Sequence, residues 1–179
     1  MTVLTILIRA ISRLNAFLGS WVVSPLALVI FAVMIWEVVA RYVFSAPTLW
    51  ATELSQLLFG VYIVLSGGWL LLHRGHVNVD ILVARLPPRR RAALDMATSV
   101  MFFLFMAVLL KEGWIMASAS FDSLERSHSA WNPPIWPVKA AIPLGIGLLF
   151  LQGLARFLQD LQILLGHAPT DTVAQGEPL

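Results

Sequence analysis

Four long stretches with hardly any charged side chains constrain this chain more than any other feature. Of its 179 residues, 59% are hydrophobic and only 12% are charged, whereas a soluble domain has roughly 25% charged residues. A bilayer core about 30 Å thick needs about 20 apolar residues of helix. We therefore predict an all-α integral membrane protein with four transmembrane helices. The predicted spans cover about 21–40, 54–72, 92–110 and 138–155.

The first eighteen residues have a different, amphipathic pattern. The apolar residues that recur there at helical spacing are Leu4, Leu7, Ile8, Ile11, Leu14 and Leu18. Arg9 and Arg13 fall on the opposite side of the helix, whereas Asn15 falls on the apolar side. This pattern predicts a helix that lies in the headgroup layer and leads into the first span. A cleaved signal peptide is the alternative, but Arg9 and Arg13 would interrupt its apolar region.

Short polar segments separate the spans. Pro47 ends the first helix and makes 42–50 a turn, 73–91 is a polar loop, and 117–137 is the longest loop. The apolar pattern of the last span continues past Arg156. We therefore predict a single membrane domain over residues 1–166 and a disordered tail over 167–179.

The distribution of Lys and Arg predicts the orientation of the chain in the membrane. With four spans, one side holds Arg9, Arg13, Arg74, Arg85, Arg89, Arg90, Arg91 and Arg156. The other side holds Arg41, Lys111, Arg126 and Lys139. Because cytoplasmic loops carry the excess of these residues, both termini are predicted to be cytoplasmic.

The predicted midplane of the membrane is uncharged. The span centres fall near Ile30, Tyr62, Phe102 and Ile146, and ionisable residues lie well away from all four. A charge at mid-bilayer costs roughly 2.5–3.5 kcal/mol even on the lenient insertion scale. Transporters therefore place a charged residue there only where the transport mechanism uses it. The sequence therefore argues against a transport path within this subunit alone.

Redox and metal chemistry also lack their usual residues in this chain. Cysteine is absent, and the four histidines lie in predicted loops or at helix ends, at His73, His76, His128 and His167. A haem held inside a four-helix bundle needs histidines that face one another between the helices. We therefore expect no enzyme activity, no catalytic residue, no cofactor and no metal site.

The charges form two bands at the ends of the spans. Glu37 and Arg41 are four residues apart, in the order that favours pairing on one helix face. Many of the other charges, including Lys111 and Arg156, are expected only to anchor spans at the membrane interface. Trp50 and Trp136 stand out among the seven tryptophans because each is close to a proline and a charge.

Three motifs follow in order along the chain. The first is Arg41-Tyr42-Val43-Phe44 with Pro47, Trp50 and Glu53-Leu54; the second is His76-Val77-Asn78-Val79-Asp80; the third is Trp136-Pro137-Val138-Lys139 with Ile142-Pro143-Leu144-Gly145. Together they resemble the small, DctQ-like membrane subunit of tripartite ATP-independent periplasmic (TRAP) transporters. The resemblance covers roughly residues 10–165.

The resemblance implies a role in a transport complex of the bacterial inner membrane. In such systems a soluble periplasmic binding protein captures an organic anion, usually a carboxylate, and delivers it to two membrane subunits. The large permease subunit carries the substrate and sodium sites, while the small subunit braces it and helps the binding protein to dock. This chain would be the small subunit, with the large permease, the binding protein and membrane lipids as its partners and no role for nucleic acid.

The resemblance also implies which residues form the interfaces. Arg41, Trp50 and Glu53 would order the outer turn, and Trp136 and Lys139 would fix the fourth helix at the outer surface. Arg74, His76 and Asp80 would order the inner loop. The alternative for all of these residues is structural pairing within the subunit.

The sequence leaves two other functions open. Copies of this chain could assemble into a channel or exporter, or the chain could anchor another membrane complex. Flux through the reconstituted chain alone would favour the first of these alternatives, because a bracing subunit predicts none.

Overall fold

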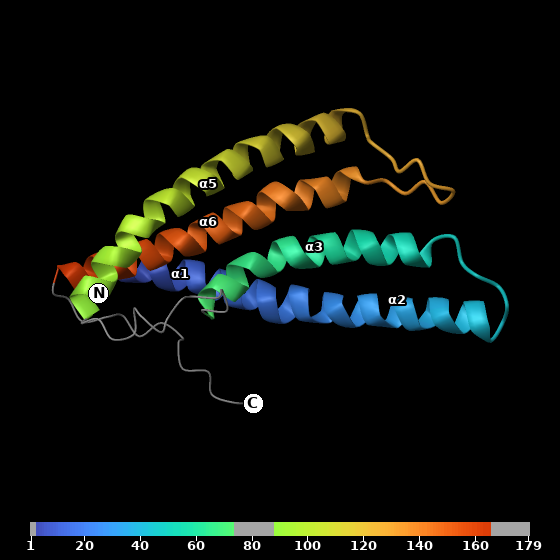
Figure 1. The fold of residues 1–179 in the computed structure, drawn as a ribbon, viewed down its shortest axis with the longest axis horizontal. Coiled ribbons are helices and arrows are strands. Elements are labelled where there is room, and N and C mark those ends of the chain that lie inside the picture. Colours follow the sequence, from blue (N-terminus) through green and yellow to red (C-terminus); the bar gives the residue numbers. More distant parts are fainter. Residues whose placement is uncertain (1–2, 74–87, 166–179) are drawn as a thin grey trace.

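The computed structural model describes residues 3–73 and 88–165, which form a bundle of long helices (Figure 1). The helices are α1 (Val3–Leu18), α2 (Ser24–Tyr42), α3 (Ala51–Leu72), α5 (Pro88–Asp122) and α6 (Trp136–Leu164). Within these described residues, four helical segments are long and apolar enough to cross a membrane, namely Thr5–Tyr42, Ala51–Leu72, Ala93–Asp122 and Trp136–Leu164. The predicted all-α membrane fold with four spans is confirmed.

Helix α6 is the central element of the bundle. It packs against α5 on one side and against α3 and α1 on the other, whereas α2 packs mainly on α3. Figure 1 shows this order, with α6 between α5 and α3. The helices α3 and α6 run in the same direction, and α2 and α5 run in the opposite one.

A short π-helix, η1 (Gly19–Val23), joins α1 to α2 without a break. Pro25 follows it and has no N–H to donate to the preceding turn. The Ser24 N–H bonds to the Gly19 carbonyl, five residues back, and the Ser24 hydroxyl reaches the same oxygen at 3.0 Å. A short π-helix of this kind commonly accommodates a missing backbone donor, here that of Pro25, within a continuous helix.

The apolar face of α1 packs on the far half of α6. Ile8 and Ile11 are buried against Ala155 and Leu158. The amphipathic helix predicted from the sequence is therefore present. Ile8 and Ile11 of its apolar side face the bundle, whereas Leu7 and Leu14 of that side are nearly half exposed. Its position in the headgroup layer stays a prediction.

Glycines bring α6 very close to its neighbours. A Cβ added to Gly145 would lie 2.5 Å from the Val64 carbonyl oxygen of α3, and one added to Gly153 would lie 2.2 Å from the Phe102 ring of α5. Small residues allow this kind of close approach between membrane helices. These contacts fix how far each helix is shifted along its neighbours.

Helix α5 is longer than the sequence suggested. Residues 117–122, predicted to belong to a loop, are helical, and the connection to α6 is reduced to 123–135. The helix ends at a Schellman turn in which Leu124 has a positive φ of 45° and the Glu125 N–H bonds to the Ser120 carbonyl at 3.0 Å. The prediction ended too early because it took the charges at Lys111 and Glu112 as the membrane boundary.

Candidate functional site

Two connections meet at one end of the bundle, which we call the two-loop end. They are the turn 43–50 between α2 and α3 and the loop 123–135 between α5 and α6 (Figure 1, right). This is the end that the sequence predicted to face outward, and it carries most of the described site residues.

Glu37 ties the turn 43–50 to the last turns of α2. Its side chain is buried, with the residue only 5% exposed. One carboxylate oxygen accepts hydrogen bonds from the Arg41 guanidinium, with the Arg41 Nε at 3.1 Å. The other oxygen accepts from the Thr48 hydroxyl and from the Thr48 N–H at 3.2 Å. The predicted pair of Glu37 and Arg41 is confirmed, and the structure adds Thr48 to it.

Thr48 also starts the next helix. Its hydroxyl oxygen accepts a hydrogen bond from the Ala51 N–H, the first residue of α3, at 3.3 Å. An orphan N–H at a helix start is satisfied in this way by a side-chain oxygen. Glu37 and Thr48 therefore set the geometry between α2 and α3.

Glu53 joins α3 to the loop 123–135. Its two carboxylate oxygens accept hydrogen bonds from the Ser127 and Ser129 hydroxyls, the second at 2.5 Å. The Ser129 hydroxyl oxygen in turn accepts the Asn132 N–H at 3.1 Å. A single carboxylate therefore orders a loop that lies more than seventy residues away in the chain.

A salt bridge closes the base of the same loop. The Lys139 ammonium of α6 lies 2.6 Å from the Glu125 carboxylate, and the Ile135 N–H bonds to the Glu125 carbonyl at 3.0 Å. The bond from Lys139 lowers the pKa of the Glu125 carboxyl below its usual value. Beside this bridge the Trp136 ring meets the Phe121 ring edge to face, with centroids 5.4 Å apart.

The structure brings together five of the residues predicted from the sequence. Arg41, Trp50, Glu53, Trp136 and Lys139 all lie at the two-loop end. Trp50 is half-buried and gives its carbonyl to the first helical bond of α3, from the Leu54 N–H at 2.8 Å. Arg74, His76 and Asp80 lie outside the described residues.

Sequence reasoning missed the partners of these residues. Thr48, Ser127, Ser129 and Glu125 were not singled out, because serine and threonine in loops are common and nothing in the spacing links them to Glu37 or Glu53. The buried bond between Asn15 and Gln152 was also missed. The one available signal was the position of Asn15 on an otherwise apolar helix face.

The comparison with known proteins agrees with this architecture. The family described as "Tripartite ATP-independent periplasmic transporters, DctQ component" matches residues 30–163, a range that holds the whole two-loop end. The chain belongs to this family. It is therefore a component of a transport system rather than an enzyme, and a small permease subunit with several membrane spans.

Three known proteins are similar to this DctQ-family chain. The chain is 25% identical over 146 residues to the sialic acid TRAP transporter small permease protein SiaQ of Vibrio cholerae, and the aligned region covers 79% of this chain and 80% of the relative. It is 31% identical over 111 residues to a putative TRAP transporter small permease protein of Haemophilus influenzae, covering 62% of this chain and 68% of the relative.

The third relative is much longer. It is the sialic acid TRAP transporter permease protein SiaT of Haemophilus influenzae, 27% identical over 146 residues, which are 79% of this chain and 22% of the relative. The similar region is therefore a minor part of that permease chain.

Proposed function

We propose that this small permease subunit braces the large permease of a TRAP complex and forms part of the surface on which a periplasmic binding protein docks. The complex takes up organic anions, in the class of carboxylates, by sodium-coupled transport across the bacterial inner membrane. Both termini of this subunit face the cytoplasm, so the two-loop end faces the periplasm. Sialic acids are carboxylates, so the substrate in the names of two relatives falls in this class.

The observation that carries the docking role is the ordered state of the two-loop end. Glu37, Glu53 and Glu125 each hold a connection to a helix through side-chain hydrogen bonds. A loop held in one conformation loses little entropy when a partner binds, so such a surface favours docking.

The bracing role is supported by the interior of the bundle. At Gly145 the backbone of α6 comes within van der Waals contact of the backbone of α3, and at Gly153 it meets the Phe102 ring. Helices packed this closely move as one body, which suits a fixed scaffold better than a conduit.

The SiaT permease of Haemophilus influenzae supports a large permease as the partner of this chain. In the SiaT permease the region similar to this chain occupies 22% of one polypeptide, so it is covalently joined to the rest of that permease. We infer that this chain associates with a large permease subunit at a corresponding place, but through non-covalent contacts.

Substitution of Glu53 by Gln tests the docking and bracing roles. Glu53→Gln keeps the shape of the side chain but weakens the bonds from the two serines, because bonds to a charged acceptor are roughly twice as strong as neutral ones. We expect weaker co-purification with the large permease or slower uptake. The matched control is Gln56→Ala, an exposed position one turn further along α3. Unchanged assembly and uptake in Glu53→Gln would contradict the proposal.

Reconstitution tests the channel alternative. The chain alone in vesicles is expected to give no anion flux, whereas flux returns when the large permease and the binding protein are added. Flux through this subunit alone would contradict the bracing role.

A further inference from the structure

The charged pair Lys111 and Glu112 lies at mid-height in the bundle, not at its end. Gly113, the next residue, packs against Ile142 and Ile146 of α6, both within 3.5 Å of an added Cβ. Gly145, between those two residues, packs against Val64 of α3. Lys111 and Glu112 are therefore level with Val64.

Val64 lies close to the middle of the apolar part of its helix. The uncharged run of α3 covers 54–72. From Val64 it is about 16 Å along the helix to Glu53 and about 13 Å to His73, at 1.5 Å per residue. Lys111 and Glu112 thus lie near the centre of the span rather than at the interface, where the sequence placed Lys111 as an anchor. The sequence predicted an uncharged midplane because it could not show how far α5 is shifted along α6.

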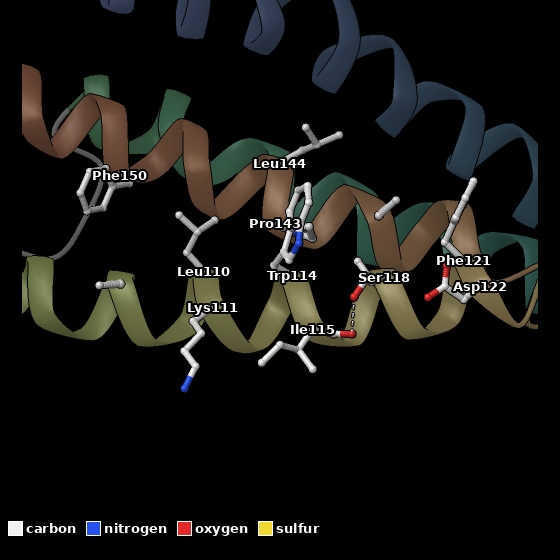
Figure 2. A pocket seen from close by; sticks show the side chains of 13 residues that line it. Leu110, Lys111, Trp114, Ile115, Ser118, Phe121, Asp122, Pro143, Leu144 and Phe150 are labelled. Carbon is white, nitrogen blue, oxygen red and sulfur yellow. Dashed lines mark hydrogen bonds between the residues drawn. The ribbon is translucent and has the colours of Figure 1, made fainter.

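Both side chains point out of the bundle. The side chain of Lys111 is 74% exposed and that of Glu112 is 62% exposed, and their nearest N–O distance is 3.8 Å, long for an ion pair. Figure 2 shows Lys111 pointing away from α6. The two residues belong to one stripe on the outward face of α5, which also holds Met101, Leu104, Phe105, Val108 and Ile115, each more than half exposed.

A lipid environment does not suit this stripe. An Arg, Lys or Asp at the bilayer centre costs at least about 2.5–3.5 kcal/mol, and such residues almost always face protein or a water-filled cavity. The side chain of Lys111 has a stem of only four carbons, too short to bring its charge to either boundary without distorting the bilayer. We therefore expect another protein segment to pack on the stripe, with side chains that can pair with both charges.

An apolar groove lies beside the stripe. It has a volume of about 1020 Å³ and runs between α5 and α6. Leu110, Trp114, Phe121 and Leu144 line it, and Lys111 lies at the edge that it shares with the stripe (Figure 2). A partner helix lying here would bury apolar surface in the groove and meet Lys111 and Glu112 on its other side.

We propose that the α5 stripe and the adjoining groove form the intramembrane interface with the large permease, through a transmembrane helix of that subunit that carries polar or charged side chains at mid-height to pair with Lys111 and Glu112. This inference rests on the proposed function, which supplies the partner. Lipid and a second copy of this chain are the other possible occupants, and the following experiment separates all three.

Photo-crosslinking tests the occupant directly. A benzophenone amino acid is placed at Val108 or Ile115 on the stripe, and, as controls, at Leu28 or Phe31 on the exposed face of α2. In the co-expressed complex, Val108 and Ile115 are expected to cross-link to the large permease. Cross-links from these positions only to lipid, or to a second copy of this chain, would overturn the inference. So would cross-links to the permease from α2 but not from α5.

A charge substitution supplies the second measurement. Lys111→Met is expected to lower recovery of the large permease roughly tenfold or more, because the partner group would be left buried without its pair. Lys111→Arg should retain more of the recovery. The thermal stability of the isolated subunit should not change, since among residues 3–73 and 88–165 the only polar contact of Lys111 is the long one with Glu112. Equal recovery with Lys111→Met would contradict the inference.

The unmodified chain distinguishes the two proposals. If it fails to co-purify with the large permease, the proposed function fails. If it co-purifies but the stripe cross-links elsewhere, only the present inference fails.

Discussion

The Asn15 side-chain amide of α1 donates a hydrogen bond to the Gln152 side-chain oxygen of α6, at 3.0 Å. Both residues are only 2% exposed, and the Asn15 amide also reaches the Ile11 carbonyl at 3.2 Å. This bond joins the first and last described helices of the chain. It explains why a polar residue lies on the apolar face of an amphipathic helix.

A double-mutant cycle measures this bond. Asn15→Leu and Gln152→Leu should each destabilise the subunit, because each leaves the other amide buried with an unmet hydrogen bond. The double variant should lose less than the sum of the two. We expect a coupling energy of about 0.6–1.7 kcal/mol, between the average and the largest value found for hydrogen bonds between membrane helices. The free energy of unfolding in mixed micelles gives the result, and strict additivity would count against the bond.

Gly145 and Gly147 are a matched pair in one helix. An alanine Cβ at 145 would lie 2.5 Å from the Val64 carbonyl oxygen, whereas at 147 it would meet nothing within 4 Å. Gly145→Ala should therefore destabilise the subunit by about 1–3 kcal/mol, since backbone must move. Gly147→Ala should be neutral or stabilising by up to about 1 kcal/mol, because alanine is the better helix former. Similar unfolding free energies for both variants would contradict the close contact of α3 and α6.

The Thr48 hydroxyl is expected to control the order of the turn 43–50. Thr48→Val removes its bonds to Glu37 and to the Ala51 N–H. We expect a loss of about 1–2 kcal/mol and faster hydrogen exchange at the Ala51 amide, since a helix start loses its side-chain acceptor. Thr52→Val, at an exposed position of α3, is the control and should leave this exchange unchanged.

Acidification should loosen the loop 123–135 through Glu125. Its pKa is lowered by the Lys139 bond from an unfolded-state value near 4.5. The stabilising effect is therefore fully present above the unfolded-state value, and it is lost as pH falls through the lower folded-state pKa. Amide NMR shifts of Glu125 and Ile135, followed from about pH 7 down to about pH 3, should report this transition. In Lys139→Met the midpoint of this pH transition should move to higher pH. An unchanged midpoint would show that Lys139 is not the cause of the lowered pKa of Glu125.

Side-chain pairs within one helix could be predicted from the sequence, because the helical period fixes their geometry. Glu37 and Arg41 are four residues apart on one helix, and the helical period alone places them on the same face. The bonds of Glu53 to Ser127 and Ser129 could not be read in this way. They join distant parts of the chain through a loop whose shape depends on its own backbone bonds, including that from the Ser127 N–H to the Pro133 carbonyl at 2.9 Å.

The sequence by itself determined the number of spans, the amphipathic first helix and the family, because length, apolar period and local motifs are properties of single segments. Only the tertiary structure decided the height of Lys111 and Glu112 in the bundle, level with Val64 of α3. That height depends on how far α5 is shifted along α6, and the shift is set where Phe102 fills the space beside Gly153 and Ile146 the space beside Gly113. Side-chain volumes that meet between two helices fix such a shift, and neither helix contains this information alone.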